Sequence, residues 1–314
     1  MKEPVAIIGA GVSGLTCAAL LAEHGYRARI LAEEIGSRTT SGAAAAIWFP
    51  YDAEPFETVI RRALRTYEIL RDLAMRNDTG VSMIELRLFS RAGDLAPPPW
   101  AVSLGPQRLP AHLIPSCFTS GFTLQVPLTD TTRYLDYLAA RFRKAGGRIE
   151  GGVRLQRLQE IHREFGLIVN CTGLGAKTLV PDPQLEAHRG QVAVVPKLPI
   201  PYAVVCDDPP LMYAIPRSHD CVLGGTNDLS DNPHADALTT AGILSECRHV
   251  LALEIAEVLD ERVGLRPFRP SGVCLRSEKL ADGRRLIHNY GHGGSGFTLS
   301  WGCAEEVWSL AESA

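Results

Sequence analysis

The residues whose spacing points most clearly to a chemical role are three glycines near the N-terminus. Gly9, Gly11 and Gly14 form a Gly-x-Gly-x-x-Gly motif directly after four apolar residues. In such a motif the first glycine permits a tight turn, the second lets the backbone approach a pyrophosphate, and the third lets a helix lie close to the strand. Free N–H groups at the start of that helix then face phosphate oxygens. The motif, which also contains Ala10, Val12 and Ser13, therefore predicts a bound dinucleotide.

The residues around the motif fit a strand, a helix and a second strand. Apolar residues recur on one side of residues 15–24, and Gly25 is placed to end that helix. Residues 27–32 have the composition of a second strand, and Glu33 comes 19 residues after Gly14. This is close to the roughly 20 residues at which a carboxylate meets a ribose hydroxyl. We expect Glu33 and the adjacent Glu34 to contact the cofactor.

Three further segments have small or hydroxyl side chains where a flat ligand needs close backbone approach. The first is a run of small residues, the second follows an apolar strand at 167–170, and the third follows a strand at 286–290 and opens a closing helix over 297–310. From these segments we predict as cofactor-binding residues Thr39, Thr40, Ser41, Ala45, Ala46, Ile47, Cys171, Thr172, Gly173, Gly291, Gly293, Gly294, Ser295, Gly296, Phe297 and Thr298.

The hydrophobic pattern divides the chain into two interleaved lobes. From residue 190 onward, apolar residues alternate with period two, which is typical of antiparallel strands joined by turns. The expected fold is α/β, a Rossmann-like dinucleotide-binding lobe plus an interleaved α+β substrate lobe with a mostly antiparallel sheet. We assign 1–52, 132–189 and 272–314 to the cofactor lobe, and 53–131 and 190–271 to the substrate lobe.

Other elements follow from periodicity and from breaking residues. Apolar residues at helical spacing predict helices over 56–75, 132–145 and 239–259, the last capped by Thr239 or Thr240. Alternation predicts a strand over 148–158, and the proline-rich residues 93–115 are expected to form a surface loop.

Composition excludes several classes of function. A net charge of −3 and a pI near 6.3 give no electrostatic basis for binding nucleic acid or an anionic membrane. The eight cysteines contain no Cys-x-x-Cys pair, so we expect reduced, buried thiols and no metal site. The first strand starts too early for a signal peptide, and cytoplasm is the expected location. The sequence leaves open whether the protein forms a homodimer.

The sequence resembles the D-amino acid and D-aspartate oxidases over essentially its whole length. The likeness is densest at residues 7–14, 44–51, 168–173, 264–270 and 288–296. It implies an FAD cofactor. It also implies that Arg266 binds the substrate carboxylate, that the hydroxyl of Tyr213 supports the same carboxylate, and that the backbone carbonyl of Gly294 accepts from the substrate amine.

The reaction implied by this resemblance is oxidative deamination of a D-amino acid. Hydride transfer to the flavin yields an imino acid, which hydrolyses to a 2-oxo acid and ammonia, and oxygen is reduced to hydrogen peroxide. Asn227 stands where D-aspartate oxidases carry an arginine, and Ile47 and Phe49 would form an apolar wall, which favours neutral or apolar substrates. Arg217 could reach an acidic side chain, so D-aspartate and D-glutamate stay alternative substrates. The short segment 206–211 indicates a reduced active-site lid.

Other functions fit parts of the pattern. A nicotinamide dehydrogenase would use the same N-terminal motif, but the glycine-rich turn at 291–296 faces the flavin in the oxidase family. An oxidase for glycine or secondary amines would differ only in the size of its side-chain pocket. A flavin-binding regulatory protein would not need Arg266 or Tyr213.

Overall fold

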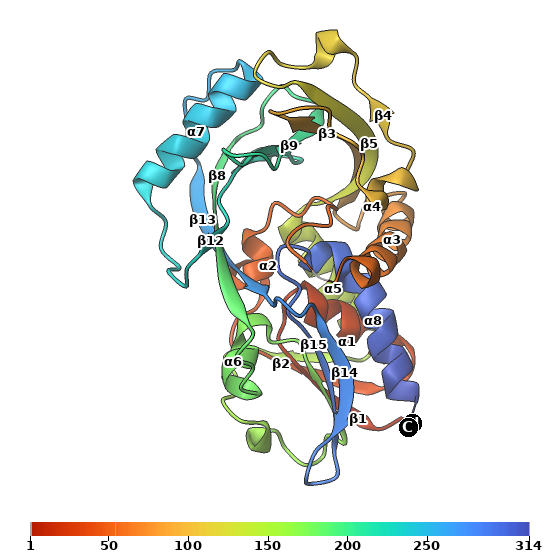
Figure 1. The fold of residues 1–314 in the computed structure, drawn as a ribbon. Coiled ribbons are helices and arrows are strands. Elements are labelled where there is room, and N and C mark those ends of the chain that lie inside the picture. Colours follow the sequence, from red (N-terminus) through yellow and green to blue (C-terminus); the bar gives the residue numbers. More distant parts are fainter. Residues whose placement is uncertain (1, 54, 314) are drawn as a thin grey trace.

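The N-terminal strand lies inside a six-stranded sheet that forms one lobe of the molecule (Figure 1). This computed structural model describes residues 2–53 and 55–313. Neighbouring strands are parallel except for β14 and β15, which pair antiparallel at one edge of the sheet. In sheet order the strands are β14 (Cys274–Lys279), β15 (Arg285–Tyr290), β7 (Leu167–Asn170), β1 (Pro4–Ile8), β2 (Arg27–Leu31) and β6 (Arg148–Glu150).

Alternating residues of β1 are buried on opposite faces of this sheet. Val5 and Ile7 belong to the large core that includes α1 (Val12–Glu23), α5 (Thr131–Lys144) and α8 (Gly296–Glu312). Ala6 and Ile8 face a smaller core with residues 161–179. Burial on both faces explains why β1 has a continuous apolar sequence.

The second lobe is a nine-stranded sheet that is mostly antiparallel. One face packs under α7 (Ala237–Leu251), and the other turns toward the first lobe (Figure 1). In sheet order the strands are β12 (Asp228–Leu229), β8 (Glu186–Pro196), β11 (Asp220–Gly224), β10 (Met212–Pro216), β9 (Tyr202–Cys206), β3 (Val81–Ser90), β5 (Ser120–Thr129) and β4 (Gln107–Arg108), with β13 (Asp260–Phe268) beside β8.

The predicted fold class is confirmed, because a mainly parallel sheet and a mainly antiparallel one alternate along the chain. The chain leaves the parallel sheet after β2, returns at β6 and β7, leaves again and returns at β14. The exact lobe boundaries stay a prediction, although β8 already belongs to the second sheet at Glu186.

Two predicted elements are wrong in extent. The helix expected at 239–259 spans Ala237–Leu251, and its cap is Asp236, whose side chain accepts from the Thr239 amide. It ends because Ala252 has a φ of 51°, and residue 259 then bonds to β8. The strand expected at 148–158 is only β6, because Gly152 turns the chain at a φ of 75°.

Other segments differ less from expectation. The predicted helices at 56–75 and 132–145 correspond to α3 (Phe56–Leu73) and α5. The segment 93–115 is mostly loop but contains the short helix α4 (Pro99–Val102), whose Trp100 is buried. No helix in the described part of the chain is long and apolar enough to cross a membrane.

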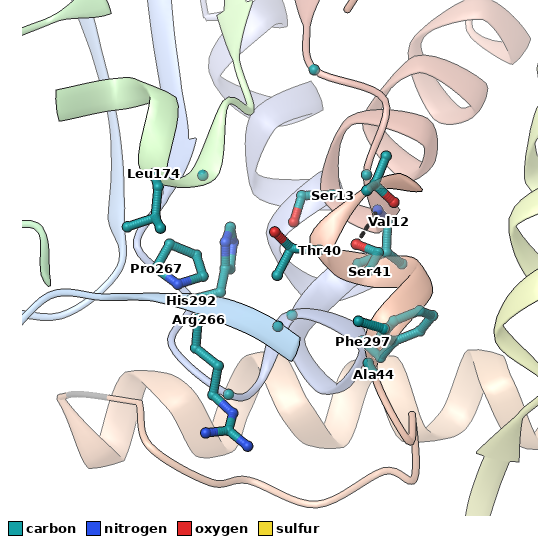
Figure 2. Close-up of a pocket in the computed structure, with 18 of the residues that line it drawn as sticks. Val12, Ser13, Thr40, Ser41, Ala44, Leu174, Arg266, Pro267, His292 and Phe297 are labelled. Atoms are coloured by element: carbon teal, nitrogen blue, oxygen red, sulfur yellow. Dashed lines mark hydrogen bonds between the residues drawn. The ribbon is translucent and has the colours of Figure 1, made fainter. Parts of the chain in front are cut away.

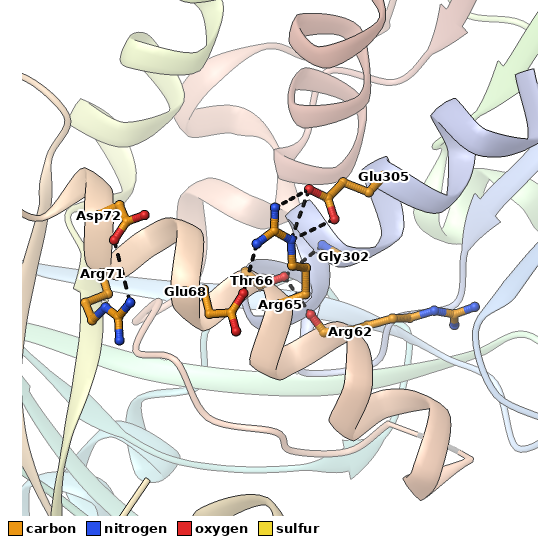
Figure 3. A network of polar contacts seen from close by, with 8 residues as sticks. All are labelled: Arg62, Arg65, Thr66, Glu68, Arg71, Asp72, Gly302 and Glu305. Carbon is orange, nitrogen blue, oxygen red and sulfur yellow. Dashed lines mark hydrogen bonds and ion pairs between the residues drawn. The ribbon is translucent and has the colours of Figure 1, made fainter. Parts of the chain in front are cut away.

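Helices α3 and α8 are joined by a polar network (Figure 3). Arg65 makes a bidentate contact with Glu305, and the hydroxyl of Thr66 accepts from the Gly302 amide at 3.0 Å. Arg62, which is only 8% exposed, donates to both oxygens of Glu306 at 3.0 and 2.7 Å. These contacts fix α8 relative to α3.

We expect Glu306→Ala to lower the free energy of unfolding by about 1–3 kcal/mol, because it leaves a buried guanidinium without its carboxylate. Glu305→Ala is the matched control on the same helix, where the partner Arg65 is half exposed. Its expected cost is below about 1 kcal/mol. Urea denaturation of the three proteins measures both values, and equal losses for the two variants would contradict the prediction.

Candidate active site

A cavity of about 580 Å³ is lined by residues from both lobes. On one side it is bordered by the segments that follow β1, β2, β7 and β15, the carboxyl ends of parallel strands. In open α/β sheets this edge is where ligands bind. On the other side it is bordered by strands of the antiparallel sheet. A cavity of this size is within the range of cofactor and ligand sites.

The N-terminal glycines form a cradle at one end of the cavity. Gly9 has a φ of 106°, and a Cβ there would lie 2.5 Å from the carbonyl oxygen of Cys171. A Cβ on Gly14 would lie 2.0 Å from the carbonyl oxygen of Gly9, so the turn and the helix can approach only without side chains. Helix α1 has no side-chain cap and no acidic residue in its first turn. Its N-terminus is therefore suited to an anionic ligand.

The hydroxyl-bearing segment lies directly beside this helix N-terminus (Figure 2). The amide of Val12 donates to the Ser41 hydroxyl at 2.9 Å. Thr39 caps the short helix α2 (Thr40–Ala43) by accepting from the Gly42 amide. This places Thr40 and Ser41 on the wall of the cavity, where their hydroxyls can donate to phosphate oxygens.

Two acidic residues border the same end of the cavity. Glu33 follows β2 and pairs with Arg154 at 3.5 Å. Glu34 pairs with Arg38 at 2.7 Å. Both carboxylates remain accessible at the position where the Gly-x-Gly-x-x-Gly motif predicts contact with a ribose.

The second glycine-rich turn connects β15 to α8 and shapes the middle of the cavity. The Gly293 amide donates to the Pro267 carbonyl at 2.9 Å, and a Cβ on Gly293 would lie 1.7 Å from the Asp52 carbonyl oxygen. The hydroxyl of Ser295 bonds to both the amide and the carbonyl of Tyr51. Thr298 binds Phe49 in the same way. The turn thus anchors the wall that carries Phe49 and Tyr51.

Arg266 extends into the other end of the cavity from β13 (Figure 2). Its Nη1 donates to the Thr226 carbonyl and to Oδ1 of Asn227, both at 2.9 Å. A Cβ on Gly190 would lie 2.2 Å from Nη2, so the side chain passes over a strand position that must be glycine. No carboxylate of the described chain pairs with this half-buried guanidinium. Its remaining donors are available to a ligand anion.

Tyr213, which is on β10, lines the cavity near Arg266. Its ring packs on Gly224 of the adjacent strand, where a Cβ would lie 2.0 Å from Cζ. Burial raises the pKa of the Tyr213 phenol, although the nearby Arg266 opposes the shift. The hydroxyl is therefore protonated at neutral pH and can donate a hydrogen bond.

We expect Gly224→Ala to lower kcat/KM about 10-fold or more, because the added methyl group displaces the Tyr213 ring and its hydroxyl. Tyr213→Phe removes the same hydroxyl without moving the strand and is the matched comparison. Steady-state kinetics of both variants measure the effect. A Gly224→Ala enzyme with wild-type kcat/KM would refute the packing argument.

His292 also borders the cavity but is not suited to acid–base chemistry. Complete burial, reinforced by the positive charge of Arg62, lowers its pKa to about 3. Its Nε2 lies 3.0 Å from Oδ1 of Asn289. The imidazole is therefore neutral at working pH and acts in packing and hydrogen bonding. No group of His, Cys, Asp and Glu in the described ranges could hold a metal ion.

Most of the residues predicted for the site line this cavity. Among the predicted substrate residues these are Arg266, Tyr213, Gly294, Ile47 and Phe49. The cofactor residues on the wall are Gly9, Ala10, Gly11, Val12, Ser13, Glu33, Glu34, Thr39, Thr40, Ser41, Ala45, Ala46, Cys171, Thr172, Gly173, Gly293, Gly296, Phe297 and Thr298.

Five predicted residues do not line the cavity. Gly14 and Gly291 shape turns behind the wall, and Ser295 anchors Tyr51. Asn227 is exposed and supports Arg266 from outside. Arg217 was placed wrongly, because it is buried in a bidentate ion pair with Asp220 at 2.7 and 2.6 Å across the β10–β11 turn.

Several lining residues were missed by sequence reasoning. Pro267 and Gly190 flank Arg266 in the structure, and Tyr51 lies two residues beyond Phe49. Asp207 immediately follows the apolar strand β9, a strand-end position of the kind that identified other site segments. Residues 207–211, which join β9 to β10, form a short connection.

Comparison with known proteins agrees with this geometry. The family model described as FAD dependent oxidoreductase, DAO, matches residues 4–310. The chain is 41% identical to a D-amino-acid oxidase of Rubrobacter xylanophilus, covering 98% of this chain and 95% of the relative. It is 39% identical to a D-amino-acid oxidase of Streptomyces coelicolor (98% and 96%) and 33% identical to human D-aspartate oxidase (96% and 93%).

Solved structures share the fold at low sequence identity. Glycine oxidase from Geobacillus kaustophilus matches with a TM-score of 0.80 at 19% identity, covering 99% of this chain and 95% of that one. The mainly parallel sheet with its glycine cradle defines a dinucleotide-binding lobe. The chain belongs to the DAO family of FAD-dependent oxidoreductases.

The cofactor of this protein is FAD, as the sequence predicted. The residues present fit that group: glycines 9 and 14 make a cradle that a Cβ would fill, and the uncapped N-termini of α1 and α8 face the cavity. Neither helix carries an acidic residue in its first turn that would repel an anionic or electron-rich ligand.

Proposed function

We propose that this protein is an FAD-dependent oxidase of D-amino acids that releases a 2-oxo acid, ammonia and hydrogen peroxide. The observation that carries the proposal is Arg266, a half-buried guanidinium that pairs with no carboxylate of residues 2–53 and 55–313, in the same cavity as the dinucleotide cradle. A free guanidinium fork matches the geometry of a substrate carboxylate. The relatives named D-amino-acid oxidase support the same activity.

The residues act mainly by positioning the substrate. Arg266 binds the α-carboxylate, and the protonated Tyr213 hydroxyl donates to the same group. The carbonyl oxygen of Gly294 accepts from the amine and so fixes a second substituent of the α-carbon. Bound FAD supplies the electron acceptor for the reaction. The apolar wall of Ile47 and Phe49 receives the side chain, so carboxylate, amine and side chain together select a single enantiomer, and correct orientation accounts for much of the rate.

The walls around the substrate end are mostly apolar. Ile47, Phe49, Val205, Leu211 and Ile215 border the cavity there. These walls support neutral or apolar D-amino acids as substrates. The other lining arginines pair with Glu33 and Glu34 at the opposite end, so within the described chain Arg266 has no second cation beside it to bind an acidic side chain. This disfavours D-aspartate and D-glutamate.

The proposal is tested by measuring peroxide release from a panel of D- and L-amino acids. We expect oxidation of D-alanine, D-valine and D-methionine, and rates with the L-enantiomers at least about 100-fold lower, because a misplaced α-hydrogen loses the positioning effect. Oxidation of glycine or secondary amines in preference to all D-amino acids would replace the proposal with the alternative activity.

The proposal also includes a cytoplasmic location. All eight cysteines are free and seven of them are buried, which suits a reducing compartment. A homodimer stays a prediction that sedimentation analysis can test. Molecular oxygen is the proposed electron acceptor.

A further inference from the structure

One lining residue is not used by the mechanism described above. Asp207 follows β9 and borders the substrate end of the cavity. Its side chain forms no ion pair or hydrogen bond with the described part of the chain. The adjacent Asp208 behaves differently, since it accepts from the Ser90 hydroxyl at 2.6 Å and from the Arg91 amide at 2.7 Å. Asp208 thus anchors the connection, and Asp207 is the carboxylate presented to the cavity.

Asp207 and Arg266 approach the cavity from different parts of the second sheet. Arg266 is on β13, and the sheet continues through β8, β11 and β10 before β9. Tyr213 on β10 lies between the two charges in sheet order. Arg266 and Asp207 form no ion pair with each other. Among the residues that the structure describes, the substrate end therefore has one free cation, Arg266, and one free anion, Asp207, at separate positions.

Asp207 is an exposed residue at the edge of the cavity, with protein around it close enough to reduce the hydration of its carboxylate. Desolvation, with a smaller contribution from the charge of Asp208, raises the pKa of Asp207 to about 6. The group is consequently ionised at neutral pH. An ionised carboxylate that has no partner among the described residues is stabilised by a cation that donates hydrogen bonds to it.

We propose that Asp207 is a specificity-determining residue that binds the cationic end of a substrate side chain. The enzyme then accepts D-arginine and D-lysine in addition to neutral D-amino acids. The methylene groups of such a side chain would run along Val205 and Leu211, and the charged end would reach Asp207. This inference rests on the proposed function, because it takes Arg266 as the site of the α-carboxylate.

The position of Gly294 separates this role from binding of the α-amine. The Arg266 Cδ is 3.5 Å from the point where a Cβ of Gly294 would lie, so these two residues are adjacent. The α-carboxylate and α-amine are therefore both bound at the β13 side. Asp207, at the end of β9, is left for the end of the side chain.

The test uses ligands that lack the α-amine and cannot be deaminated. They are 5-guanidinopentanoate, which has the arginine side chain, and 5-ureidopentanoate, which has the same shape without the positive charge. Titration calorimetry on the FAD-loaded enzyme gives the two dissociation constants. We expect the guanidino compound to bind about 10- to 100-fold more tightly, the range for a charge-assisted hydrogen bond.

Two variants test whether Asp207 causes the preference for the guanidino ligand. Asp207→Asn keeps the side-chain shape and should reduce the ratio of the two dissociation constants to about 1–3. Asp136→Asn is the matched control, since Asp136 is exposed on α5, outside the cavity lining, and its loss changes the net charge equally. It should preserve the wild-type ratio. A wild-type ratio near 1, or a ratio retained in Asp207→Asn, would overturn the proposal.

Kinetics with D-arginine and D-citrulline provide the second readout. The kcat/KM ratio of these two substrates should fall in Asp207→Asn by the same factor as the binding ratio. An equal loss of kcat/KM for both substrates, with their ratio unchanged, would place Asp207 at the α-amine and overturn the proposal. If the wild-type enzyme oxidises no D-amino acid but shows the binding preference, the proposed function fails and the ligand preference of Asp207 stands.

Discussion

Replacing Arg266 by alanine should lower kcat/KM for D-amino acids by about 30- to 5,000-fold. Loss of a buried charged partner costs about 2–5 kcal/mol of binding, which converts to this range at 1.36 kcal/mol per factor of ten. The guanidinium is half buried, is supported by Thr226 and Asn227, and has no carboxylate partner among the residues that the structure describes. Steady-state oxidation of D-alanine measures the change.

Two variants separate this effect from general disturbance of the strand. Arg262→Ala lies on the same strand, pairs with Asp260 and does not border the main cavity, so it should retain wild-type kcat/KM. Arg266→Lys keeps the charge but loses the planar fork and should recover only part of the activity. An Arg266→Ala enzyme with normal turnover and normal KM would remove this residue from the substrate site.

Replacing Gly14 by alanine should weaken FAD binding about 5- to 150-fold. The added Cβ would lie 2.0 Å from the Gly9 carbonyl oxygen, so either the turn or helix α1 must move. Overpacking of this kind costs about 1–3 kcal/mol, and here the displaced atoms are those that surround the pyrophosphate. Quenching of FAD fluorescence during titration of the apoprotein gives the dissociation constant.

The matched control is Gly242→Ala on helix α7. A Cβ on Gly242 has no neighbour within 4 Å, so the substitution should leave FAD binding unchanged and stabilise the helix by about 0.5–1 kcal/mol. Equal FAD affinities for the Gly14→Ala and wild-type proteins would show that the close contact between turn and helix does not shape the cofactor site.

The residues that could be predicted from sequence are those whose role depends on the backbone. Gly9, Gly11 and the strand-end segments at 171–173 and 293–298 are fixed by local geometry, because a turn between a buried strand and a helix leaves few alternatives. All of them except Ser295 line the cavity as predicted. The roles of Arg266, Tyr213 and Gly294 came from family resemblance, and their chemistry stays a prediction.

The residues that could not be predicted depend on side-chain direction within the second sheet. Arg217 and Asp207 both follow apolar strands, yet one turns back to Asp220 and the other faces the cavity. The direction depends on strand pairing across β9, β10 and β11, which periodicity alone does not specify. The predicted helix is longer than the observed one, Ala237–Leu251, because apolar residues continue past its end. Leu253 and Ile255 pack in the core beside it, and the Leu259 amide bonds to Val194 of β8.

The most direct test of the account is anaerobic addition of D-alanine, and separately of L-alanine, to the purified protein while its visible absorbance is recorded. The account predicts a yellow protein whose flavin absorbance is bleached by D-alanine, unchanged by L-alanine, and restored when air is admitted. A colourless protein that does not bind added FAD, or equal bleaching by both enantiomers, would contradict the claim that this cavity holds FAD beside a stereospecific amino acid site.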